Sequence, residues 1–170
     1  MKWTELLRRL GAAEPADWVD DEDDVSTARE QLHRFLFLRE ATRYMASTRD
    51  FGWIDNQLAF AGRDPTGPMA GGGLAIASML AKGVEKAEIA ELVRATQAAA
   101  IFDLCYQLSG GDFDVRDQEL AEQAGLGPLG WALVTVDEKE EPGDMIIAGL
   151  HESVLASDPE GREMRPRDPA

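Results

Sequence analysis

The chain has 170 residues, the length of one domain, and its 32 acidic and 17 basic side chains give a formal net charge of -15. A field of that sign repels nucleic-acid phosphates and anionic lipid headgroups and attracts basic partners. We therefore expect a basic protein among its partners, and no nucleic acid and no membrane. The hydrophobic fraction of 44% is that of a globular protein and argues against general disorder.

The first residues and the cysteine content indicate a cytoplasmic protein. The segment MKWTELLRRLGAAEP carries charges where a signal peptide has its apolar core. No run approaches the roughly 18 consecutive apolar residues of a membrane span. The single cysteine, Cys105, cannot form an internal disulfide, which agrees with a reducing compartment. We expect a single domain over residues 1–170.

An acidic linker over residues 14–24 follows a short predicted helix over residues 3–10, which Gly11 ends. The linker contains no base. Its acids are Glu14, Asp17, Asp20, Asp21, Glu22, Asp23 and Asp24. Trp18 and Val19 interrupt the acidic run, and this pattern predicts a linker pinned by an apolar anchor.

A long amphipathic helix is predicted from Ser26 or Thr27 to about Thr48. Thr27 and Glu30 have the spacing of a capping box. The apolar stripe recurs every three or four residues, at Ala28, Leu32, Phe35, Leu38, Thr42 and Met45. Phe37 is off this stripe, so either the helix is buried on two sides or Phe37 belongs to a contact surface.

The middle of the chain predicts further helices. Residues 50–60 form a short helix or turn, residues 62–73 a Gly- and Pro-rich loop, and residues 74–82 a helix. A second strong helix runs over residues 85–108 and is stopped at Gly110–Gly111. Because it is apolar nearly all round, we expect it to be the buried centre of the domain.

The last part of the chain predicts a β-hairpin. After an acidic, Gly-rich stretch with a short helix at 117–124, residues 131–136 and 145–148 read as strands around a turn at 137–144. An irregular tail begins at about residue 158. The predicted fold class is mainly α, a small helical bundle with a short C-terminal β-hairpin.

Motifs for cofactor, metal or nucleophile chemistry are weak. Gly71–Gly73 precede a helix but lack the Walker pattern, which favours a structural loop or a close helix approach. Two histidines and one cysteine offer few ligands for a zinc site, and residues 20–24 lack the residue spacing of a calcium-binding loop. Cys105 reads as core packing. We therefore expect no cofactor and no metal.

Two classes of function remain. The first is a small acidic cytosolic protein-binding domain, such as a bacterial immunity or antitoxin-like protein, that engages a basic partner rather than catalysing a reaction. Its partner-binding residues are expected to be Asp17, Trp18, Asp20, Asp21, Glu22, Asp23 and Asp24. The alternative is a small enzyme or ligand-binding domain with a pocket near His151 and Glu152, which Asp55, Asn56 and Arg63 complete. A homo-oligomer is compatible with both.

Overall fold

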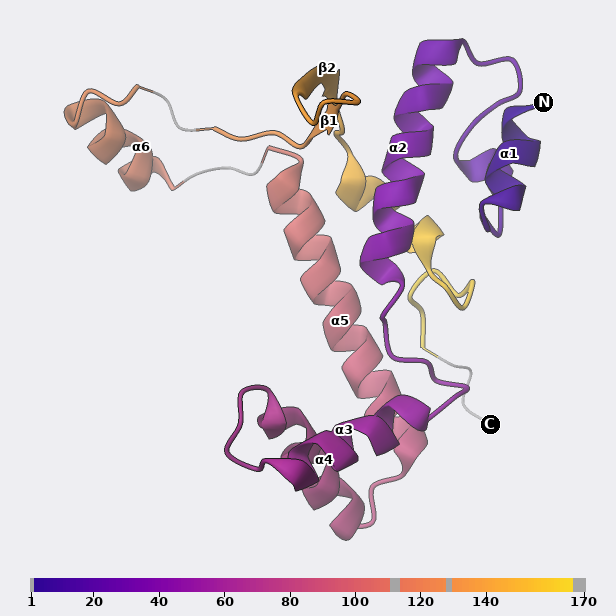
Figure 1. The fold of residues 1–170 in the computed structure, drawn as a ribbon, viewed down its shortest axis with the longest axis vertical. Helices are drawn as coiled ribbons and strands as arrows, with labels where there is room; N and C mark the ends of the chain where they lie inside the picture. The colour runs from indigo at the N-terminus through magenta and orange to yellow at the C-terminus, as the bar shows by residue number, and fades with distance from the viewer. Residues whose placement is uncertain (1, 111–113, 128–129, 167–170) are drawn as a thin grey trace. The chain divides into compact units, whose positions relative to one another are not determined.

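The computed structural model describes residues 2–110, 114–127 and 130–166. It is mainly α-helical with a small antiparallel hairpin near the C-terminus, as the sequence predicts (Figure 1). The chain forms two compact units, one from the residues up to Arg43 together with Ala100–Glu163, the other from Tyr44–Ala99 and the residues from Met164 onward. The prediction of a single domain stays a prediction. In these described ranges no helix combines the length and apolarity that a membrane crossing requires.

The first unit begins with α1 (Trp3–Arg9), a 3-10 turn (Pro15–Asp17) and α2 (Val25–Thr42). Helix α1 ends as predicted, because Gly11 adopts the left-handed conformation (φ 96°) that glycine tolerates best. The predicted cap of α2, Ser26 or Thr27, was wrong by two or three residues. The side chain of Asp24 is the cap, since its carboxylate accepts the backbone N–H groups of Ser26 and Thr27 at 2.8 and 3.1 Å.

Helix α2 also ends earlier than predicted, at Thr42 instead of Thr48. The Thr42 hydroxyl lies within 2.8 Å of the carbonyl of Leu38 and within 3.1 Å of that of Ser157. This buried contact holds the last turn of α2 to a segment near the C-terminus. Tyr44–Ala99 belong to the other compact unit. The apolar spacing that continues to Met45 therefore does not continue the helix.

The core of the first unit forms around one aromatic pair. Trp18 is 5% exposed, and its ring meets that of Phe35 edge to face at 5.1 Å between centroids. Other buried apolar side chains of this unit lie in α1, the acidic segment, α2, α5 and residues 147–154, among them Leu7, Val19, Leu38, Cys105, Ile147, Leu150 and Val154. The predicted apolar anchor in the acidic linker is therefore confirmed. Phe37 is half-buried.

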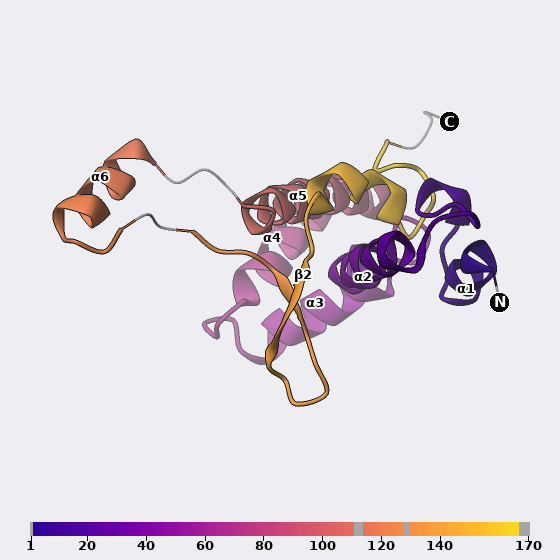
Figure 2. The same ribbon diagram turned by 90° about the horizontal axis from the view of Figure 1, so that it is seen from above.

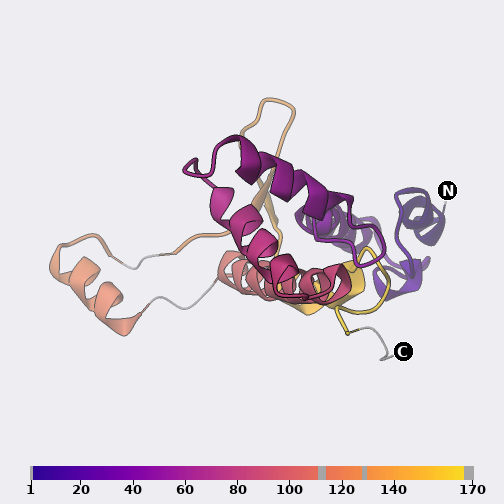
Figure 3. The same cartoon turned by 90° about the horizontal axis from the view of Figure 1, so that it is seen from below.

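The second unit contains α3 (Gly52–Arg63) and α4 (Ala70–Ala81), which pack side by side (Figure 3). Ile54 and Ile76 meet Ile89 of α5 in its core. The prediction that Gly71–Gly73 lie in a loop was wrong, because all three are helical, whereas the alternative of a close helix approach is confirmed at Gly73. A Cβ on Gly73 would collide with the backbone of Gln57 and lie 2.6 Å from the Cβ of Ala61, so this glycine permits the close approach of the two helices.

Helix α5 (Lys86–Leu108) has the predicted length but not the predicted burial. Ile89 and Cys105 are buried. Several large apolar side chains are exposed instead: Leu92, Phe102, Leu104 and Tyr106. A helix that is apolar on every side needs cover on every side, and the described chain covers only part of α5. The expectation of a fully buried central helix is therefore wrong.

The C-terminal part contains α6 (Val115–Gln123) and the hairpin of β1 (Val134–Val136) and β2 (Pro142–Ile146) (Figure 2). Val134 pairs with Ile146 and Val136 with Pro142. The predicted turn was too long, and β2 begins at Pro142 instead of Met145. The carboxylate of Asp137 explains this, because it accepts the N–H groups of Lys139 and Glu141 and closes the turn early.

Two 3-10 turns, Leu150–Ser153 and Leu155–Ser157, follow the hairpin and pack against α2. The predicted irregular tail begins at Asp158, which is buried and whose carboxylate accepts the N–H groups of Glu160 and Arg162. Parts of three predicted segments lie outside the described residues: Gly111 of the glycine stop, residues 112, 113, 128 and 129 of the acidic stretch, and residues 167–170 of the tail.

Gly73→Ala should destabilise the protein, because the added methyl group has no room against Gln57 and Ala61. Overpacking of this kind costs about 1–3 kcal/mol. Gly71→Ala is the matched control, since nothing lies within 4 Å of a Cβ at that position of the same helix. It should be neutral or stabilising, because alanine favours helices over glycine by about 1 kcal/mol. Thermal unfolding of both variants measures the difference, and equal midpoints would contradict the close helix contact.

Candidate functional site

The acidic segment, residues 14–24, is bound to α1 by hydrogen bonds and an ion pair. The Asp21 carboxylate accepts the backbone N–H of Thr4 at 3.0 Å and its hydroxyl at 2.9 Å, and pairs with Lys2 at 3.0 Å. The indole N–H of Trp3 donates to the backbone carbonyl of Asp23 at 3.2 Å. The bond from the Thr4 N–H is the main reason why the pKa of Asp21 falls from 3.8 to about 2.

Three further carboxylates of the segment bind backbone N–H groups. Asp23 accepts the N–H of Asp20 at 2.8 Å, and Asp20 accepts that of Glu22 at 3.1 Å. Asp24 caps α2, and the N–H of Thr27 is the main cause of its lowered pKa. Because these donors are neutral amides, each carboxylate keeps its negative charge while it shapes the turn.

The remaining carboxylates of the segment point to solvent. Glu14, Asp17 and Glu22 are exposed, and within the described ranges no hydrogen bond or ion pair engages their side chains. We call these three the free acids of the segment. Trp18, predicted as a partner-binding residue, is buried, whereas Glu14 was not predicted as one although the run without a base includes it. The structure thus separates the acids that build the turn from those that face outward.

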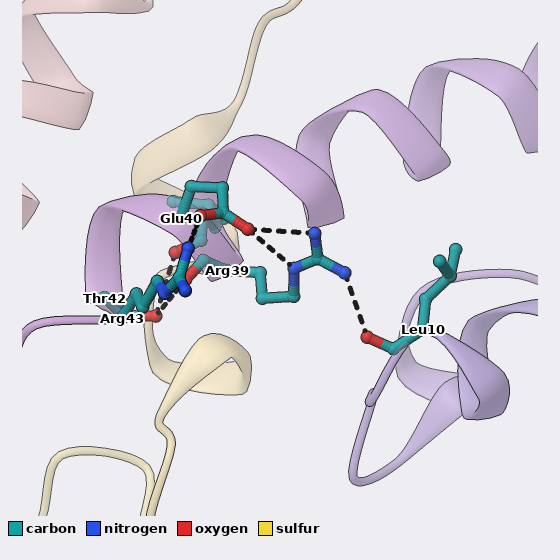
Figure 4. A network of polar contacts seen from close by, with 6 residues as sticks. Leu10, Arg39, Glu40, Thr42 and Arg43 are labelled. Carbon is teal, nitrogen blue, oxygen red and sulfur yellow. Dashed lines mark hydrogen bonds and ion pairs between the residues drawn. The ribbon is translucent and has the colours of Figure 1, made fainter.

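A groove of about 620 Å³ lies in the first unit between residues 11–13, the end of α2 and residues 156–159. Arg39 donates to the Glu40 carboxylate at 2.9 and 3.2 Å and to the carbonyl of Leu10 at 3.1 Å (Figure 4). Arg43 donates to the other oxygen of Glu40 at 3.1 Å. The two guanidinium groups, Arg39 first, lower the pKa of Glu40.

This groove has no surplus of positive charge. Arg39 and Arg43 are balanced by Glu40 and by Asp158, which also lines the groove. The arginines lie near the end of α2, where positive charge complements the helix dipole, and Arg39 connects α2 to the end of α1. Their arrangement therefore supports the packing of α1 and does not by itself indicate an anionic ligand.

A second groove, of about 550 Å³, lies between α2 and the hairpin. Arg29 and His33 line one side, and Asp137, Glu138 and Asp144 line the other. Among the described residues, no group of three or more His, Cys, Asp or Glu side chains has the arrangement of a metal site. The groove adds a second acidic surface to the molecule, close to the tip of the hairpin.

The second predicted site lies in a turn after the hairpin. His151 and Glu152 lie in the turn Leu150–Ser153, and they line neither of the two grooves. The His151 ring makes T-shaped contacts with Phe102 and Tyr106, with centroids 6.1 and 5.2 Å away, and its buried Nδ1 atom has no hydrogen-bond partner among the described residues. Glu152 is exposed.

The other side chains considered for chemistry lie elsewhere. Asp55, Asn56 and Arg63 are on α3, which belongs to the second unit, whereas His151 belongs to the first. Burial raises the pKa of the Cys105 thiol, so this cysteine stays protonated and inert, as predicted for a core residue.

Asp21→Asn should lower the unfolding temperature at pH 6 to 7. Because the folded-state pKa of Asp21 is depressed to about 2, its contribution is complete above 3.8 and is lost as the pH falls towards 2. The difference between wild type and variant should therefore shrink over that interval. Glu22→Gln is the control and should leave the unfolding temperature nearly unchanged. A difference for Asp21→Asn that persists undiminished at pH 2 would contradict the assignment.

The comparisons with known proteins give this chain no relatives: no family model, no curated protein and no solved structure matches it.

Proposed function

We propose that this protein is a small acidic protein-binding domain that engages a basic protein partner through the acidic segment. The observation that carries the proposal is that the carboxylates within residues 14–24 fall into two groups. Asp20, Asp21, Asp23 and Asp24 shape the segment through bonds to α1, α2 and its own turn. The free acids are left exposed to solvent. A partner therefore meets carboxylates on a segment that is already folded.

The physical advantage of such a surface is that it meets a partner of opposite charge quickly and selectively. Complementary charge raises association rate constants from about 10⁵–10⁶ to as much as 10⁸–10⁹ M⁻¹s⁻¹ at low salt. A segment already ordered by Trp18 and by its own hydrogen bonds loses less conformational entropy on binding. The net charge of -15 extends this attraction beyond the segment itself.

A bacterial immunity protein or antitoxin fits these properties. Such a protein acts in the cytoplasm by covering a toxin, and a toxin that acts on nucleic acid presents a cationic surface to it. The acidic segment would occupy that surface in place of phosphates. The alternative, an enzyme or ligand-binding domain around His151 and Glu152, stays a prediction, because the contacts of His151 are with aromatic rings and not with a second catalytic group.

The test begins with affinity capture by the full-length protein at low and at raised salt, from the host that encodes it. A basic protein should be recovered at low salt and be reduced at high salt, since the attraction between charges is screened. Recovery of no basic protein under either condition counts against the proposal.

The free acids are then neutralised together, as Glu14→Gln, Asp17→Asn and Glu22→Gln. The association rate constant with the captured partner should fall about tenfold, while the dissociation rate changes less, because exposed charges act mainly on encounter. The matched control, Glu138→Gln, Glu140→Gln and Glu141→Gln, removes the same net charge from the hairpin turn. An equal loss in both triple variants would assign the effect to overall charge, not to the acidic segment.

A further inference from the structure

A group of aromatic rings lies exposed at the end of α5. Phe102 and Tyr106 are one turn apart on the helix and are 41% and 46% exposed. His151 lies edge-on against both rings. Trp131 is 47% exposed, and its indole N–H donates to the carbonyl of Gln107 at 2.7 Å. We call Phe102, Tyr106, Trp131 and His151 the aromatic patch.

These rings are held in place although they face solvent. The hydrogen bond from Trp131 connects the segment before β1 to the last turns of α5. The contacts of His151 join the turn after β2 to the same helix. Three segments that are far apart in the sequence therefore meet at the last turns of α5, and all three belong to the first unit. Such contacts are not expected of exposed side chains that have no role at the surface.

The charges around the aromatic patch are acidic. In the three segments that supply the rings, residues 100–108, 130–136 and 147–154, the charged side chains are Asp103 and Glu152, and both are exposed. Arg34 approaches the same turn: its guanidinium and the carboxylate of Glu152 lie 3.1 and 3.2 Å from the place that a Cβ on Gly149 would take. That side chain is only 13% exposed and is paired with Glu30 at 3.3 Å, so it faces inward.

We propose that the aromatic patch is a second contact surface for the basic partner, on which arginine or lysine side chains of that partner lie against the rings. The inference rests on the proposed function, because it takes the basic character of the partner from it. Cations are attracted to the faces of Trp, Tyr and Phe, and the attraction is worth about 0.5–2 kcal/mol for each contact. Tyr and Trp are also enriched among the residues that dominate binding energy at interfaces.

The division between the two surfaces follows from their chemistry. The free acids are fully hydrated charges, which accelerate encounter but add little to the lifetime of a complex. The aromatic patch offers apolar area and ring faces, which act only at short range and slow dissociation. The patch therefore supplies what an acidic surface lacks, and its flanking carboxylates, Asp103 and Glu152, select a cationic occupant.

The test uses a short oligoarginine peptide as the probe and an oligoglutamate peptide as its negative control. Tyr106→Ala and Trp131→Ala should each raise the Kd for oligoarginine about three- to tenfold, mainly through faster dissociation. Leu104→Ala is the matched control: it removes an apolar side chain that is 55% exposed, two residues from Phe102 on the same helix. It should leave the Kd unchanged, and circular dichroism checks that all three variants fold.

The outcomes separate this inference from the proposed function. If the free-acid variant slows association while Tyr106→Ala and Trp131→Ala leave dissociation unchanged, the acidic segment stands and the aromatic patch is overturned. If the aromatic variants lose affinity and the free-acid variant does not, the patch stands and the role of the segment is overturned. A shift of oligomeric state in sedimentation, without any change in peptide binding, would identify the patch as a contact between copies of this chain and would also overturn the inference.

Discussion

The packing of Trp18 against Phe35 is the contact on which the N-terminal half of the first unit depends. It places an apolar side chain from the middle of an acidic run beneath α2, and the run must then pass over the surface between α1 and α2. Negative charges brought so close together repel one another. The repulsion is offset because Asp20, Asp21, Asp23 and Asp24 each bind backbone N–H groups, and Lys2 pairs with Asp21.

The same contact explains which acids are exposed. Burial of Trp18 and Val19 fixes the direction of the segment, so that Asp21 meets α1 and Asp24 meets the first turn of α2. Glu14 and Asp17 precede Trp18, Glu22 follows Asp21, and all three are exposed. A surface that attracts a partner is in this way a by-product of how the chain enters α2. The proposed function uses the free acids, whose carboxylates take no part in the folding of the segment.

Much of this fold could be predicted from the sequence, because the strongest signals are local. Apolar spacing located α1, α2 and α5, and the strand pattern of residues 131–136 located the hairpin, although Pro142 and Gly143 of the predicted turn lie in β2. The errors arose where side chains act on the backbone at short range. Asp24 caps α2 in place of the capping box that Thr27 and Glu30 predicted, and the hydrogen bonds of Asp137 shorten the hairpin turn. Gly71–Gly73 looked like a loop because the need for a close contact with Gln57 exists only once α3 and α4 are packed.

The candidate site was less predictable, for a physical reason. Composition showed that the segment is acidic, but not which carboxylates accept hydrogen bonds, since these depend on the turns of the segment and, for Asp21, on the position of α1. The rings of Phe102, Tyr106, Trp131 and His151 come from three distant segments, and no local pattern relates them. The apolar character of α5 was visible, but periodicity reports how much of a helix is apolar and not how much of it the chain covers.

The contact between Thr42 and Ser157 spans 115 positions of the chain, and it closes a unit that is built from two separated stretches of sequence. The second unit is nearly continuous in sequence, so during synthesis it can fold before the C-terminal turns that cover α2 have been made. At roughly 5–20 residues per second, that wait is on the order of 6–23 seconds. Throughout it, α2 lacks its contacts with the turns Leu150–Ser153 and Leu155–Ser157, so the apolar surface that they cover stays exposed on the nascent chain.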